Sequence, residues 1–150
     1  MRTAITARID GADTTQVFDQ VASLEHYPAW LRMVHRVEPG GVDDGRPAWH
    51  VELRARVGPL TRSKRLRMVR TVFEPEHRVK FERVQDDDRD HAEWILEAIV
   101  DDDPAGTLLT MDLEYTGDLW AESVLRRILD DEVARGERAL REVIVSAPRR

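Results

Sequence analysis

The stretch VFDQVASLEHYPAWLRMVHRVE, residues 17–38, places a short amphipathic segment directly before a proline flanked by aromatic side chains. Upstream of it, Asp13 and Gln16 form a D-x-x-Q variant of the capping box, which marks the start of a helix. The apolar residues that follow recur at helical spacing: Val17, Phe18, Val21, Ala22 and Leu24. The sequence therefore predicts a short helix with one buried face.

Pro28 lies between Tyr27 and Trp30 in the segment HYPAWL. Proline lacks the N–H that a helix interior needs and disfavours helical geometry in the residue before it. We expect a kinked junction, followed by a second short helix that begins near Pro28, because proline suits a first helical turn. The chain has only four Trp, two Tyr and three Phe. We therefore expect Tyr27 and Trp30 to cover either a core or a ligand.

The sequence on both sides of this region alternates between apolar and polar residues, which is typical of strands with one buried face. Residues 3–9 alternate in this way, and residues 39–41 (Pro-Gly-Gly) predict a turn. Further strands are expected at 48–57, 65–73, 78–84, 92–100 and 107–115. The pattern predicts an antiparallel meander with one solvated face.

From Leu119 the apolar period changes from two to 3.6 and continues until Pro148. This predicts one long helix of about 27 residues, which would span about 40 Å. Because the strands and the long helix are segregated in the sequence, we expect an α+β fold with the terminal helix packed across a concave sheet.

The composition restricts the class of protein. A chain of 150 residues with 41% apolar content predicts one domain, residues 1–150. We expect no transmembrane helix, no signal peptide at the N-terminus and a cytoplasmic location. The absence of cysteine excludes disulfides and thiolate catalysis. The net charge of -6 argues against a nucleic-acid partner.

Neither a metal site nor a cofactor is predicted. The five histidines show no ligand spacing, and the acidic runs at 86–90 and 101–104 lack the spaced pattern with glycine that calcium loops use. We interpret these runs as solvated turns.

The order of elements and the stretch at 17–38 resemble the SRPBCC or START-like superfamily, with its Bet v 1-like helix-grip fold, and within it the polyketide cyclase/dehydrase-like group. The resemblance covers the whole chain in architecture and is specific in sequence at YPAWL. It implies a curved antiparallel sheet of about seven strands around a long C-terminal helix, with two short helices between strands 1 and 2. It also implies an apolar cavity for a polyketide, lipid, isoprenoid or similar molecule, without implying one reaction.

If the apolar side of each strand faces the helix, these side chains form either a cavity wall or a filled core. The strands contribute Trp49, Val51, Leu53, Leu66, Met68, Val79, Phe81, Trp94, Leu96, Leu109, Met111, Leu113 and Tyr115. Tyr27 and Trp30 would shape the entrance, and Leu125 and Ile128 would contribute from the long helix. The ligand-binding prediction comprises Tyr27, Trp30, Trp49, Val51, Leu53, Met68, Arg70, Phe81, Trp94, Leu96, Met111, Tyr115, Leu125 and Ile128.

Arg70 continues the apolar alternation of Leu66 and Met68, which places a guanidinium on the apolar face. A buried charge needs a carboxylate, a polar ligand group or a route to solvent. We expect Arg70 to bind a ligand carbonyl, enol or carboxylate. The alternative is a bulge that turns it outward. The resemblance favours the first view, because aromatase/cyclases of the family have a cavity arginine in this part of the sheet.

Catalytic residues are not defined by the sequence, and the candidates are Arg70, Tyr115 and His26. Arg70 could stabilise an enolate. Tyr115 could donate a hydrogen bond into the cavity or could be a core tyrosine. His26 could transfer a proton at the cavity mouth or could be a surface histidine. No carboxylate stands out on the predicted inner faces, which weakens an enzymatic interpretation.

The basic stretch at 54–70 has two interpretations. Arg54, Arg56, Arg65 and Arg67 would lie on the wet face of a hairpin and pair with glutamates such as Glu52. Alternatively, the stretch docks an acidic partner or anionic headgroups.

Three hypotheses follow. The first is a binding protein for a hydrophobic small molecule. The second is a polyketide cyclase or dehydratase-like enzyme that uses Arg70. The third is a module that forms a homodimer through Leu125, Ile128 and Leu140 of the long helix.

Overall fold

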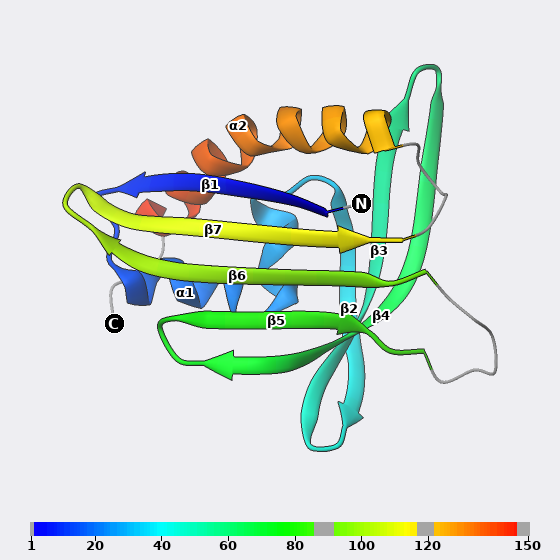
Figure 1. Cartoon of the computed structure of the whole chain (residues 1–150), viewed down its shortest axis with the longest axis horizontal. Helices are drawn as coiled ribbons and strands as arrows, with labels where there is room; N and C mark the ends of the chain where they lie inside the picture. Colours follow the sequence, from blue (N-terminus) through cyan, green and yellow to red (C-terminus); the bar gives the residue numbers. More distant parts are fainter. Residues whose placement is uncertain (1, 86–91, 117–121, 147–150) are drawn as a thin grey trace.

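The computed structural model of the chain describes residues 2–85, 92–116 and 122–146. In these residues seven strands form one antiparallel sheet in the order β1-β7-β6-β5-β4-β3-β2 (Figure 1). The strands are β1 (Arg2–Asp10), β2 (Val34–Asp43), β3 (Arg46–Val57), β4 (Leu60–Glu74), β5 (Arg78–Arg83), β6 (Trp94–Asp103) and β7 (Gly106–Tyr115). Between β1 and β2 lie helix α1 (Thr14–Val21) and the 3-10 helix η1 (Leu24–Ala29), and the chain continues after β7 to helix α2 (Glu122–Ser146).

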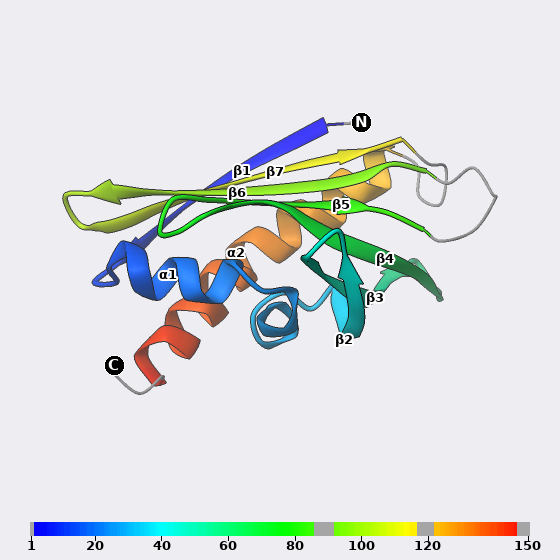
Figure 2. The same cartoon turned by 90° about the horizontal axis from the view of Figure 1, so that it is seen from below.

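The helices α1, η1 and α2 all lie on one side of the sheet, and β2 and β3 turn toward that same side (Figure 2). Helix α2 crosses beneath the sheet and packs on β1, while α1 packs beneath β6 and β7. The predicted curved sheet with a long C-terminal helix is confirmed. The core lies between the concave face and the three helices, where the largest fully buried side chains include Tyr27, Phe81, Ile9 and Leu140.

The predicted capping box of α1 is present. The Gln16 backbone N–H donates to Asp13 Oδ1 at 2.8 Å, and the Asp13 backbone N–H donates to Gln16 Oε1 at 3.0 Å. The prediction of a second short helix beginning near Pro28 is only partly right. Residues Leu24–Ala29 form a 3-10 helix with Pro28 inside it, closed by bonds such as Trp30 N–H to Tyr27 O at 3.1 Å. Because the hydrogen bonds of a 3-10 helix join residues three apart, one short helix takes the place of the predicted kink and second helix.

The predicted turn at residues 39–41 is wrong, because β2 runs through these residues to Asp43. The strand is at the edge of the sheet, where proline is tolerated because no ladder bond is required of its nitrogen. Irregular register between Pro39 and Val42 absorbs the local distortion. The chain reverses instead at Asp44 and Gly45, whose φ values of 53° and 77° suit a tight hairpin turn.

The outer face of the β3–β4 hairpin is charged, as expected for the basic stretch. Arg65 Nε lies 3.8 Å from Glu52 Oε1, and Arg65 is exposed. Arg67 was expected on the same wet face, but it is buried. Its Nε donates to Gly40 O at 3.2 Å, and its Nη1 lies 3.3 Å from Asp43 Oδ2. The end of the edge strand β2 therefore covers this arginine, which corrects the prediction.

Candidate ligand-binding site

A cavity of about 120 Å³ lies between the concave face of the sheet, the segment that follows η1, and α2. The surface that faces the cavity is apolar. Strands β1, β3, β4, β6 and β7 all contribute to its wall, as do the residues after η1 and one face of α2. The lining residues are Ile5, Ala7, Leu24, Trp30, Leu31, Met33, Val34, Val51, Leu53, Leu66, Met68, Trp94, Leu96, Leu109, Met111, Leu113, Glu132, Gly136, Glu137 and Leu140.

The residues predicted from sequence divide into two groups around this cavity. Those in its lining are Trp30, Val51, Leu53, Met68, Trp94, Leu96 and Met111. Those outside its lining are Tyr27, Trp49, Arg70, Phe81, Tyr115 and Ile128. The side chain of Leu125 lies outside the described residues. Alternation along the strands placed the sheet residues on the concave face, but it could not separate the wall from the packing beside it.

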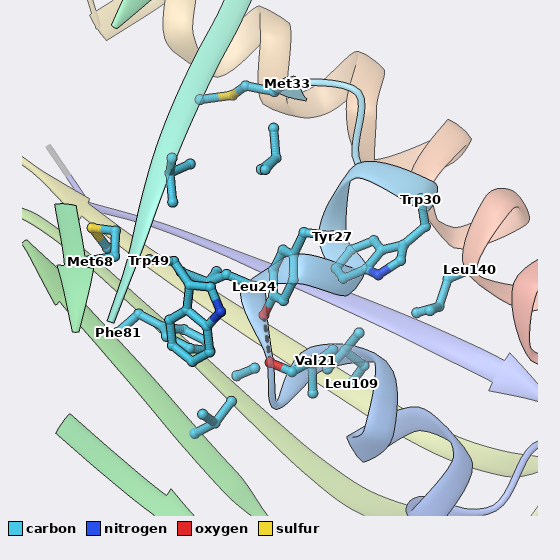
Figure 3. Close-up of a cluster of buried hydrophobic side chains, with 14 of the residues drawn as sticks. Val21, Leu24, Tyr27, Trp30, Met33, Trp49, Met68, Phe81, Leu109 and Leu140 are labelled. Carbon is cyan, nitrogen blue, oxygen red and sulfur yellow. Dashed lines mark hydrogen bonds between the residues drawn. The ribbon is translucent and has the colours of Figure 1, made fainter. Parts of the chain in front are cut away.

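An aromatic cluster stands beside the cavity and supports Trp30 (Figure 3). The ring of Tyr27 is 4.7 Å from that of Trp30 and 6.1 Å from that of Phe81, and Trp49 is 5.7 Å from Phe81. The Tyr27 hydroxyl donates to Val21 O at 2.9 Å, and burial raises the pKa of Tyr27 above its ordinary value. Tyr27 therefore joins η1 to the end of α1 and remains neutral.

Arg70 remains on the concave side of the sheet, where it pairs with Phe81 across the strands. A register shift follows it, between Arg70 and Val72, so Phe73 rather than Val72 shares its face. Arg70 Nη1 donates to Ala22 O at 2.7 Å, and its guanidinium lies 4.2 Å from the Phe73 ring. Desolvation lowers the pKa of Arg70. The charge thus pairs with the C-terminus of α1, where a cation is favourable.

These contacts predict a structural cost for removing the guanidinium. We expect Arg70→Met to lower the free energy of unfolding by about 1–2 kcal/mol, because a charged hydrogen bond and a cation–π contact are lost. Urea denaturation would measure it. The control is Arg54→Met on the exposed outer face of β3, with an expected change of less than about 0.5 kcal/mol. Equal losses in the two variants would contradict this account of Arg70.

The other two candidate catalytic residues have different surroundings. Tyr115 is buried, and its ring is 4.4 Å from that of Trp94. His26 is exposed on η1. The catalytic roles of Arg70, Tyr115 and His26 stay predictions.

Sequence reasoning assigned Leu125 and Ile128 of α2 to the cavity, but it missed two carboxylates of α2 that line it, Glu132 and Glu137. Glu132 is buried, and its Oε2 accepts a hydrogen bond from the Arg32 backbone N–H at 2.9 Å. Gly136 comes one turn later, where an added Cβ would stand 3.3 Å from Trp30 O. The four-residue spacing of Glu132, Gly136 and Leu140, with a glycine inside a helix, was the available signal of one face in close contact.

Two negative findings apply to the described residues. They contain no group of three or more His, Asp or Glu side chains arranged to hold a metal ion. None of their helices is long and apolar enough to cross a membrane.

A curved antiparallel sheet that wraps a long C-terminal helix and encloses an apolar cavity defines a helix-grip protein. The chain belongs to the family described as polyketide cyclase / dehydrase and lipid transport, whose model matches residues 2–145. The family resemblance seen in the sequence is confirmed. A comparison with curated protein sequences gives no significant match.

Solved structures share the fold. The di-domain ARO/CYC BexL from the BE-7585A biosynthetic pathway is 18% identical, with a TM-score of 0.70 over 99% of this chain and 51% of that one. The di-domain ARO/CYC StfQ from the steffimycin pathway is 12% identical, with a TM-score of 0.66 over 94% and 49%. The protein TTHA0849 from Thermus thermophilus is 16% identical, with a TM-score of 0.69 over 99% of both chains. The chain spans about half the length of the two di-domain proteins.

Proposed function

We propose that the protein binds a hydrophobic small molecule in the cavity between the sheet, the segment after η1 and α2. The observation that carries this proposal is the apolar cavity itself, which the folded chain leaves unfilled. Dense packing is the norm in protein interiors, so an unfilled space forfeits contacts that a ligand can restore. The family description, which includes lipid transport, supports the same function.

The size of the cavity limits what it holds without rearrangement. An engineered apolar cavity of about 150 Å³ in another protein binds benzene. The cavity of about 120 Å³ therefore accommodates roughly one ring. A longer ligand therefore extends beyond this unfilled volume.

The proposal is tested on freshly purified protein. Native mass spectrometry is expected to detect a retained apolar molecule. In protein from which any such molecule has been removed, ligand-observed NMR is expected to show saturable binding of cumene (isopropylbenzene). The proposal would be contradicted if the protein retained no molecule and also showed no saturable binding of cumene.

The alternative function is a polyketide cyclase or dehydratase-like enzyme, which the family description and the likeness to two ARO/CYC proteins favour. In this alternative Arg70 stabilises an enolate. Its guanidinium would have to leave Ala22 O, to which it donates at 2.7 Å. Turnover of a bound ligand by the wild type but not by Arg70→Met, with both variants folded, would support the enzyme. Equal ligand affinity and equal product formation would exclude a role for Arg70.

The remaining predictions receive less support. Ile128 and Leu140 of α2 pack against the protein's own core, so they offer no separate face to a second copy of the chain. The homodimer, the acidic partner, the absence of a nucleic-acid partner and the cytoplasmic location stay predictions.

A further inference from the structure

Trp30 carries a buried hydrogen-bond donor that the folded chain leaves unused. Its side chain lines the cavity and is only 4% exposed. The indole Nε1 has no hydrogen-bond partner among the described residues. A buried donor without a partner costs about 1–3 kcal/mol, and buried indole N–H groups usually find one. A molecule that brings an acceptor into the cavity would remove this cost.

The indole is held in position before any ligand arrives. The Tyr27 ring packs on it at 4.7 Å, and the backbone of Gly136 approaches it from α2. In Figure 3 the ring edge that carries Nε1 is turned toward Leu109 and Leu140, which line the same cavity. The nitrogen has almost no accessible surface, so a neighbouring apolar side chain has to shift when an acceptor docks.

The charges around the cavity disfavour an anionic ligand. The described lining contains no Lys, Arg or His, whereas Glu132 and Glu137 belong to it. Their carboxylates pair with Arg32, Arg135 and Arg141, whose side chains are 40% or more exposed and reach toward solvent. A carboxylate drawn into the cavity would lose its hydration without meeting a cation in the wall, which is costly.

We propose that the ligand is an uncharged apolar molecule with a hydrogen-bond acceptor, such as a ketone or quinone oxygen, and that Trp30 Nε1 donates to that acceptor. This inference rests on the proposed function and adds the charge and the polar group of the ligand. It assigns the specificity of the site to one indole nitrogen and to the absence of a cation in the described wall.

Three ring-sized probes test the proposal: acetophenone, cumene and benzoate. Cumene has a methyl group where acetophenone has its oxygen, and benzoate carries a charge. Their affinities are measured by ligand-observed NMR for the wild type, Trp30→Phe and the control Trp49→Phe, which removes an indole outside the cavity lining. The preference for acetophenone over cumene is expected to fall about five- to tenfold in Trp30→Phe only, the size of one net hydrogen bond. Benzoate is expected to bind the wild type at least about tenfold more weakly than acetophenone.

A second measurement does not depend on the variants. In the wild type, acetophenone is expected to move one indole N–H resonance downfield in a ¹H–¹⁵N spectrum, because the N–H donates a hydrogen bond to its oxygen. Cumene has no acceptor and is expected to cause no downfield shift of that resonance. An unchanged preference in folded Trp30→Phe, no such downfield shift, or binding of benzoate as tight as that of acetophenone would overturn the inference. If any of these results is found while cumene still binds the wild type saturably, the proposed function stands and only the inference fails. Failure of all three probes to bind would overturn both.

Discussion

Ala7→Phe is expected to abolish binding of cumene, with an affinity loss of at least about 100-fold, while the protein stays folded. Ala7 lies on β1 opposite Leu109 of β7, and both residues line the cavity. A phenyl ring at this position occupies a space that holds roughly one ring. Filling a cavity commonly raises the free energy of unfolding of a protein by about 0.5–2 kcal/mol, whereas overpacking lowers it by about 1–3 kcal/mol. We therefore expect the free energy of unfolding to change by less than about 2 kcal/mol.

The matched control for this prediction is Ala4→Phe. Ala4 lies on the same strand, but it is exposed on the opposite face, where it pairs with Asp112. The same added ring is therefore expected to leave the cumene affinity within about twofold of the wild type. Binding is measured by ligand-observed NMR and folding by circular dichroism. If Ala7→Phe binds cumene as well as Ala4→Phe does, the ligand site is elsewhere.

Phe81→Ala is expected to cause the largest loss of stability, about 3–5 kcal/mol in the free energy of unfolding. Phe81 is fully buried, and its ring meets those of Tyr27 and Trp49 edge to face at 6.1 and 5.7 Å. Removing the ring leaves a void between η1 and β5, and such a void costs free energy because the surrounding structure relaxes only partly. Urea denaturation, analysed with a common slope, would measure the loss.

Phe73→Ala is the control for the same chemical change at a partly solvated position. Phe73 lies on the neighbouring strand β4 and is 49% exposed, with contacts to Phe18 and Arg70. Because much of its ring is already in water, we expect a loss of about 1 kcal/mol. Similar losses for the two variants would show that Phe81 does not hold the sheet and η1 together as described.

The features that sequence predicted well are those determined within a few residues. The capping box of Asp13 and Gln16 depends on a spacing of three, and both of its hydrogen bonds are present. The β7 strand and the long helix α2 follow from periods of two and 3.6, which set which side chains share a face. Alternation also placed Arg70 on the concave side.

The errors concern residues whose environment comes from distant parts of the chain. Residues 39–41 have turn composition, but the position of β2 at the sheet edge lets them remain in a strand. Arg67 alternates with outward residues, yet β2 folds over it. For Arg70 the sequence could not identify the partner Ala22 O, which lies 48 positions away in the chain.

The sequence by itself determined the order of the elements, the apolar side of each strand and the family, because local spacing and capping encode them. Only the tertiary structure decided which apolar residues pack against one another and which surround an unfilled space. The cavity depends on how far α2 stands from the concave sheet, and that distance results from contacts such as Gly136 against Trp30 and Glu132 against Arg32. These contacts join residues about 100 positions apart, so no local pattern in the chain records them.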